Sequence, residues 1–147
     1  MKHSNKTYKI FTDGATKGFN GKLGTVSVVG LGVYIPHLGV DGKKYCKKMN
    51  GISNNEAEFK ALIYGMEKAI EKGIKKAAFF LDSKIVVSRA NGQRARGKWA
   101  NARMDAFQDQ VAELEKEFEE ITFAWIPREQ NWMADKLSKE GIYGKVS

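Results

Sequence analysis

Residues 54–82, NNEAEFKALIYGMEKAIEKGIKKAAFFLD, decide the fold, because the spacing of the apolar residues changes within this stretch. The first part predicts a helix that Ser53, Asn54 or Asn55 can cap and that Gly73 can end. Its apolar residues recur every three or four positions, which is one face of a helix: Phe59, Leu62, Ile63, Met66, Ala69 and Ile70. The second part, AAFFL, is a short apolar run that is typical of a strand buried on both faces.

Upstream of this stretch the sequence predicts three strands of antiparallel type, at Tyr8–Thr12, Thr25–Ile35 and Lys43–Met49. A glycine-rich loop over residues 14–24 would join the first two strands. Turn residues at 38–42 predict a hairpin between the second and the third.

Downstream, strands alternate with helices. The apolar and turn residues predict, in order, a strand at Ala77–Leu81, a short helix at Ser83–Ala90, a long helix from Met104 to Phe118, a strand at Ile121–Ile126 and a last helix from Asn131 or Asp135 to Lys139, closed by Gly141. This order predicts an α/β protein whose mixed five-stranded sheet has three antiparallel strands, then parallel ones, and is flanked by helices.

The length of 147 residues is that of one domain, and we expect a single domain over residues 1–147 with its core at about 7–140. One cysteine, Cys46, excludes a disulfide framework and a four-thiolate zinc site. No apolar stretch approaches the ~20 residues of a membrane span, and the first residues do not have the pattern of a secretory signal. These features predict a cytoplasmic monomer without a membrane association or an obligate protein partner.

The formal net charge is +8, and the excess of lysine and arginine lies before residue 111, while residues 111–147 are net acidic. A basic surface attracts polyanions, so the charge favours nucleic acid as a partner. A lysine-rich surface that serves only solubility explains the charge equally well.

Two acids follow apolar strand-like runs directly: Asp13 after Tyr8–Thr12 and Asp82 after Ala77–Leu81. Open α/β sheets bind ligands at the carboxyl ends of their strands, where a carboxylate loses hydration unless a cation compensates. Each acid also has an ordinary structural explanation, a turn at Asp13-Gly14 and a helix cap at Asp82.

Two further acids lie in the first turns of predicted helices, Glu58 beside the apolar stripe and Asp135 near the C-terminus. The helix dipole alone favours acids at such positions. Together, however, these carboxylates without neighbouring histidine or thiolate ligands suit Mg²⁺ or Mn²⁺. Two such ions can hydrolyse a phosphodiester, so a basic protein with this acidic centre is consistent with a nuclease.

Four motifs in this order resemble type 1 ribonuclease H, in a short form that lacks the full basic protrusion. They are Thr12-Asp13-Gly14-Ala15, residues 54–62 (NNEAEFKAL), residues 81–87 (LDSKIVV) and residues 131–137 (NWMADKL). The resemblance covers nearly the whole chain, from about Tyr8 to Glu140.

The resemblance implies the ribonuclease H-like fold and an endonuclease that hydrolyses the RNA strand of RNA/DNA hybrids, leaving 3′-hydroxyl and 5′-phosphate ends. It implies two Mg²⁺ ions, with Mn²⁺ as a substitute, on the core ligands Asp13, Glu58 and Asp82 and a fourth, more mobile carboxylate, Asp135. It also implies contacts to the hybrid, which would involve Gly14, Ser53, Asn54 and Asn55. The two asparagines would approach the minor groove, where 2′-hydroxyls distinguish RNA from DNA.

The sequence departs from the family in two places. Many members have a histidine in the loop before the last acid, whereas this chain has Arg128, its expected substitute, with Glu129 as the rival. The family's basic region is reduced to residues 91–101, where the candidate hybrid contacts are Arg94, Arg96, Lys98 and Trp99. Trp99 could instead be the first core residue of the long helix.

Three alternatives remain open on the sequence. Another nuclease of the same fold, such as a resolvase or an exonuclease, would differ in its products. A non-catalytic hybrid-binding domain would bind without turnover, although such a domain has no use for four clustered acids. A protein-interaction domain with a basic face would bind hybrid without the salt dependence of a phosphate-binding protein.

Overall fold

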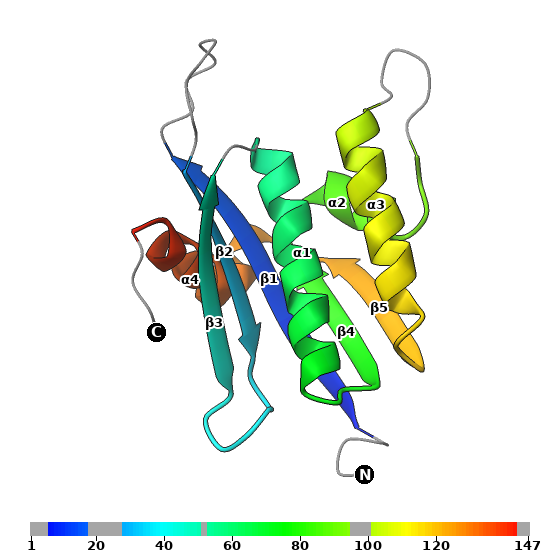
Figure 1. Cartoon of the computed structure of the whole chain (residues 1–147). Coiled ribbons are helices and arrows are strands. Elements are labelled where there is room, and N and C mark those ends of the chain that lie inside the picture. The colour runs from blue at the N-terminus through cyan, green and yellow to red at the C-terminus, as the bar shows by residue number, and fades with distance from the viewer. Residues whose placement is uncertain (1–5, 18–27, 51–52, 95–100, 144–147) are drawn as a thin grey trace.

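A five-stranded mixed sheet forms the centre of the computed structural model, which describes residues 6–17, 28–50, 53–94 and 101–143 (Figure 1). In chain order the elements are β1 (Thr7–Lys17), β2 (Val28–Ile35), β3 (Lys43–Asn50), α1 (Asn54–Glu71), β4 (Lys76–Leu81), α2 (Lys84–Ala90), α3 (Ala102–Glu115), β5 (Glu120–Trp125), the short 3₁₀ helix η2 (Arg128–Asn131) and α4 (Trp132–Ile142).

The strand order across the sheet is β3-β2-β1-β4-β5. The first three strands pair antiparallel, and β1 pairs parallel with β4, as β4 does with β5. The predicted fold class and the order of strands and helices are therefore confirmed. β1 is the central strand, so the side chains of β1 lie between the antiparallel half and the parallel half of the sheet.

Helices cover both faces of the sheet. Figure 1 shows α1, α2 and α3 in front of the sheet and α4 behind β1 and β2. α1 begins where the sequence allows, at Ser53, whose hydroxyl accepts from the Glu56 N–H while the Glu56 side chain accepts from the Ser53 N–H. This reciprocal cap fixes the start of α1 next to β1.

The main core lies between the sheet and the front helices, and its largest fully buried side chains include Phe59, Phe79, Ile10, Leu62 and Met66. In β4, alternate residues are buried and half-buried, so the prediction of burial on both faces is wrong. The physical reason is that α4 covers β1, β2 and β3 on the other face and does not extend over β4.

β1 is longer than the sequence predicts. The antiparallel pairing with β2 continues through Asp13↔Gly32 as far as Lys17↔Val28, so the strand does not end at Thr12. Asp13 and Gly14 consequently lie within a strand and not in a turn. The rest of the predicted glycine-rich loop, and the predicted strand residues 25–27, fall outside the described residues.

The last helix also differs from the prediction. Gly141 does not close it but lies inside α4, which ends at Ile142. A Cβ at Gly141 would stand 2.7 Å from the backbone oxygen of Lys47, so glycine is needed there for close packing on β3. The turn Arg128–Asn131 of 3₁₀ helix was not predicted.

Helix α3 ends before Phe118, although that ring still packs against the core, edge-on to Phe79.

Within the described part of the chain, none of the helices combines the length and the apolar character needed to cross a membrane.

Candidate active site

Asp13 and Asp82 are brought together by the parallel pairing of β1 and β4. Phe11 pairs with Phe80, and each acid stands two residues further along its own chain. Both side chains therefore reach the same end of the sheet, although Asp13 is still in its strand and Asp82 has just left its own. The indole N–H of Trp125 donates to the Asp82 backbone oxygen at 3.2 Å and holds this corner to β5.

Glu58 approaches the same point from the first turns of α1. Its Oε1 accepts the backbone N–H of Gly14 at 3.2 Å. A Cβ at Gly14 would lie 2.3 Å from the backbone oxygen of Ala57, so only glycine lets α1 sit this close to β1. The helix start thus places its carboxylate directly beside Asp13.

The three carboxylates form one cluster, in which an oxygen of each of Asp13, Glu58 and Asp82 lies within 4.8 Å of the others. Burial, with the nearby charges of Asp82 and Asp135, raises the pKa of Asp13 from its ordinary value to about 7. Burial and the charge of Asp13 raise the pKa of Glu58 further still. Three hard oxygen donors that repel one another at close range fit a divalent cation such as Mg²⁺ or Mn²⁺.

The ordinary structural explanations for two of these acids do not apply. Ser83, and not Asp82, caps α2, because its hydroxyl accepts the N–H of Val86 at 3.3 Å. Asp13 is 4% exposed and lies within β1, so it forms no turn. Neither carboxylate is therefore explained by local backbone geometry.

Asp135 lies near the cluster but outside the group of three. It is on the first turn of α4, and it forms ion pairs with Lys139 at 3.2 Å and with Arg128 at 3.7 Å. Its charge contributes to the raised pKa of Asp13. The surface-exposed Glu129 is not among the residues that line the pocket, whereas Arg128 is, so the geometry favours Arg128 over its rival.

A pocket of about 490 Å³ opens over the cluster. All four predicted acids line it, together with the cations Lys17, Arg128 and Lys139. Lys17 donates to the hydroxyl of Tyr143 at 3.2 Å and lies 4.5 Å from the centre of its ring. An acidic centre surrounded by cations can accept a metal ion and, beside it, a phosphate group.

The predicted hybrid-contacting residues, three at the start of α1 and Gly14 in β1, have different environments. Asn54 lines the pocket, and its side-chain oxygen accepts from the hydroxyl of Thr16. Asn55 is exposed. Ser53 is occupied as the helix cap, and Gly14 is required by the contact with α1. Contacts of these four residues to a hybrid stay predictions.

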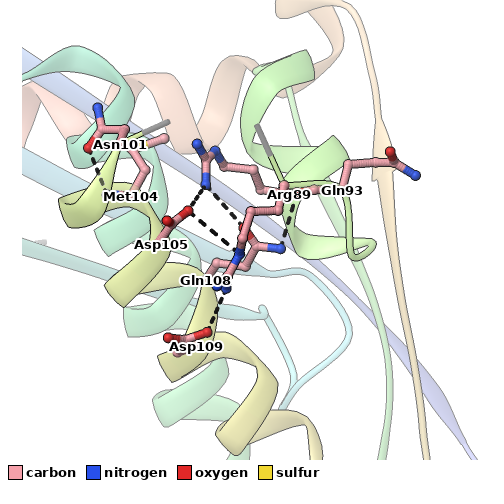
Figure 2. Close-up of polar contacts among 8 residues, drawn as sticks. Arg89, Gln93, Asn101, Met104, Asp105, Gln108 and Asp109 are labelled. Atoms are coloured by element: carbon pink, nitrogen blue, oxygen red, sulfur yellow. Dashed lines mark hydrogen bonds and ion pairs between the residues drawn. The ribbon is translucent and has the colours of Figure 1, made fainter. Parts of the chain in front are cut away.

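Of the four candidate hybrid contacts in the predicted basic region, Arg94 lies in the described part of the chain, and Arg96, Lys98 and Trp99 fall outside it. Arg94 pairs with Asp109 at 2.6 Å and with Asp105 at 3.6 Å, both on α3. The same Asp105 also accepts from the buried Arg89 at 2.8 Å, in a network that joins α2 to α3 (Figure 2). Arg94 must therefore exchange existing partners before it can bind a phosphate.

Sequence reasoning missed two buried polar residues that touch the acids. Asn131 donates to the side chain of Asp82 at 3.1 Å, and the hydroxyl of Ser138 lies 3.3 Å from Asp13. The available signal was their spacing from Asp135, which places all three on one side of a helix.

Comparisons with known proteins give the family of this chain. The Reverse transcriptase-like family matches residues 40–141, and the chain belongs to this family. EbsB of Enterococcus faecalis is 32% identical over 136 residues, which are 91% of this chain and 93% of that protein. The bifunctional protein Rv2228c of Mycobacterium tuberculosis is 30% identical over 133 residues, 90% of this chain. The chain spans about a third of that longer protein, 35% of its length.

Two solved ribonuclease H structures are similar to this chain over most of its length. The N-terminal RNase H domain of Rv2228c is 27% identical with a TM-score of 0.74, and 94% of each chain is covered. LC11-RNase H1, solved in complex with an RNA/DNA hybrid, is 25% identical with a TM-score of 0.76, covering 93% of this chain and 97% of that one. The predicted resemblance to type 1 ribonuclease H is confirmed.

Proposed function

We propose that this protein is an endonuclease that hydrolyses the RNA strand of RNA/DNA hybrids and leaves 3′-hydroxyl and 5′-phosphate ends. The observation that carries the proposal is the cluster of Asp13, Glu58 and Asp82, with oxygens within 4.8 Å of one another at the end of the central strands. The similarity to a ribonuclease solved with a hybrid supports the choice of substrate. The activity is proposed for residues 1–147 as a single domain.

The acids would hold two divalent cations, Mg²⁺ with Mn²⁺ as a substitute. When bound, such ions supply an activated water and neutralise the charge that develops on the leaving oxygen. Asp13 and Asp82, together with Asp135, would hold one of the ions. Asp13 and Glu58 would hold the other. Asp135 lines the pocket and forms salt bridges with Arg128 and Lys139.

The chain's own cations would orient the substrate. Arg128 on η2 and Lys139 on α4 stand beside Asp135, and Lys17 stands at the end of β1, so phosphates on either side of the scissile bond would each meet a positive charge. Asn54 and Asn55 would reach the minor groove of the hybrid from the start of α1. Arg94, Arg96, Lys98 and Trp99 would contact the hybrid further along its length.

The test uses one labelled RNA strand in three forms: annealed to DNA, annealed to RNA, and single-stranded. A DNA duplex of the same sequence is the fourth substrate. Each is incubated with Mg²⁺ and the wild-type protein or Asp82→Asn. Asp41→Asn is the matched control, because it makes the same charge change at an exposed position in the β2–β3 turn. We expect cleavage of the hybrid's RNA only, lost in Asp82→Asn and retained in Asp41→Asn.

Other outcomes would overturn the proposal. Hybrid binding without cleavage, in Mn²⁺ as well as Mg²⁺, would make the protein a binding domain. Cleavage of the DNA duplex would assign it to a different nuclease branch. Products with a 3′-phosphate would exclude in-line attack by water with a 3′-oxygen as the leaving group.

A further inference from the structure

Three polar residues lie at the start of α4: Asn131, which ends η2 and caps the helix, and Asp135 and Ser138 within the helix. Their spacing of four and then three residues places them on one side of a helix. Asn131 and Ser138 are almost fully buried, at 1% and 0% exposure, although each is polar. Buried polar groups of this kind are retained where they make specific hydrogen bonds.

Asn131 joins the last helix to two separate parts of the site. Its amide nitrogen donates to the backbone oxygen of Thr12 at 3.0 Å and to Oδ2 of Asp82 at 3.1 Å. One bond fixes the amide to β1 next to Asp13, and the other holds the Asp82 carboxylate. Since Trp125 holds the Asp82 backbone from β5, this acid is restrained at both its backbone and its side chain.

Ser138 contacts Asp13 from α4, where its hydroxyl shares one proton between two acceptors. Its hydroxyl lies 2.7 Å from the backbone oxygen of Asp135 and 3.3 Å from Oδ2 of Asp13. The position of this hydroxyl is fixed by close packing, because a Cβ on Gly30 would stand 1.8 Å from the Ser138 backbone oxygen. The helix backbone therefore cannot shift toward the sheet, and the Ser138 side chain stays against Asp13.

We propose that Asn131 and Ser138 are positioning residues, which orient the carboxylates of Asp82 and Asp13 for the cations that the cluster binds. The proposal rests on the proposed function and deepens it. Helix α4 then has two tasks, since it supplies Asp135 and also fixes two of the three clustered acids. Hydrogen bonds to ligating carboxylates set their orientation, and their loss typically costs about 10- to 100-fold in metal affinity or activity.

The test compares Asn131→Ala and Ser138→Ala with two control variants. Asn91→Ala removes an asparagine that donates to the Phe123 backbone oxygen at 3.2 Å, away from the cluster. Tyr64→Phe removes a hydroxyl that donates to the Cys46 backbone oxygen at 3.4 Å. Mn²⁺ binding to the hybrid-free protein is measured by calorimetry, stability by urea unfolding in EDTA, and kcat and KM on a hybrid over a range of Mn²⁺ concentrations.

We expect Mn²⁺ affinity to fall about 10- to 100-fold in Asn131→Ala and about 10-fold in Ser138→Ala, and to stay within 2-fold in both controls. KM for the hybrid should change little, while kcat falls and recovers as Mn²⁺ is raised. A purely structural role would lower stability without this recovery. If Asn131→Ala does not fold, Ser138→Ala decides, because alanine fits the same helix position.

Two results separate this inference from the proposed function. If Asn131→Ala and Ser138→Ala both bind Mn²⁺ with wild-type affinity, the positioning role is overturned, even if the protein cleaves hybrid. Asp82→Asn is the positive control for a loss of Mn²⁺ affinity. Mn²⁺ binding that depends on Asn131 and Ser138, in a protein that cleaves no hybrid, would support the positioning role and overturn the function.

Discussion

The backbone N–H of Gly14 lies 3.2 Å from Oε1 of Glu58, although the two residues are 44 positions apart in the chain. This contact joins the central strand to the start of α1 and places the Glu58 carboxylate beside Asp13. It depends on glycine, because a Cβ at this position would meet the backbone of Ala57 at 2.3 Å.

Gly14→Ala should consequently displace α1 from β1. We expect the free energy of unfolding to fall by about 1–3 kcal/mol, the usual cost of forcing an extra carbon into a tight contact. Activity should fall much further than stability, since Glu58 moves with the helix. Urea unfolding and hybrid cleavage on the same samples check this. Unchanged cleavage in Gly14→Ala would show that this contact does not position Glu58.

The stability of the metal-free protein should depend on pH through Asp13. Its pKa is raised to about 7 in the folded chain, mainly by burial, so the folded protein holds this proton more tightly than the unfolded chain does. The free energy of unfolding is then highest below the unfolded pKa of about 4, and it falls as pH rises through about 7. Between pH 5 and pH 8 we expect a fall of about 2 kcal/mol.

Urea unfolding in EDTA at several pH values measures this fall, and comparison with Asp13→Asn gives the contribution of Asp13 together with its effect on the pKa of Glu58. The variant should be more stable than wild type at pH 8 and similar at pH 5. Addition of Mn²⁺ should stabilise the wild type and leave the variant almost unchanged. A wild-type protein that gained stability between pH 5 and pH 8 relative to Asp13→Asn would contradict the assigned sign.

Arg94 should bind hybrid better once the closer of its two partners on α3 is removed. Asp109→Asn eliminates the 2.6 Å ion pair and leaves the guanidinium for a phosphate. We expect tighter hybrid binding at low salt and a steeper salt dependence, by up to about one unit in the slope of log K against log salt. Fluorescence anisotropy at four salt concentrations measures both quantities.

Glu113→Gln is the matched control for Asp109→Asn. It makes the same charge change on α3 but disrupts the Lys116 pair at 2.9 Å, so it separates the release of Arg94 from a general gain of positive charge. Equal effects of the two variants would mean that Arg94 makes no contact with the hybrid.

Alanine substitutions of Arg128 and of Glu129 should have different effects on kcat. Arg128 lines the pocket and pairs with Asp135, whereas Glu129 does not line it. Arg128→Ala should lower kcat roughly 10-fold, less than the loss of a buried donor to a reacting oxygen, because its side chain is 74% exposed. Glu129→Ala should leave kcat within 2-fold. Single-turnover cleavage at saturating Mg²⁺ checks both, and a reversed order would assign the role to Glu129.

Much of the fold could be predicted because it depends on local patterns. The apolar period of three and four residues marks α1, Ser53 marks its start, and the turn residues at 38–42 mark the hairpin between β2 and β3. The end of β1 could not be predicted in this way. Asp13-Gly14 is a turn signal locally, but pairing with β2 continues the strand to Lys17. Gly141 was misread for the same reason, since its partner, the Lys47 backbone, is remote in sequence.

The candidate site, like the fold, could be predicted only where it depends on residues that are close in sequence. The sequence by itself determined which acids are available and placed Glu58 and Asp135 near the starts of helices, because a helix start is set by neighbours a few residues away. It placed Asp13 at the end of a strand, whereas pairing with β2 puts this residue inside β1. Only the tertiary structure decided that Asp13, Glu58 and Asp82 share one cluster, that Arg94 is already paired, and that Asn131 and Ser138 reach the acids. The reason is physical: hydrogen bonds, charge repulsion and loss of hydration depend on distances in space, and the packing of β1, β4, α1 and α4 sets those distances.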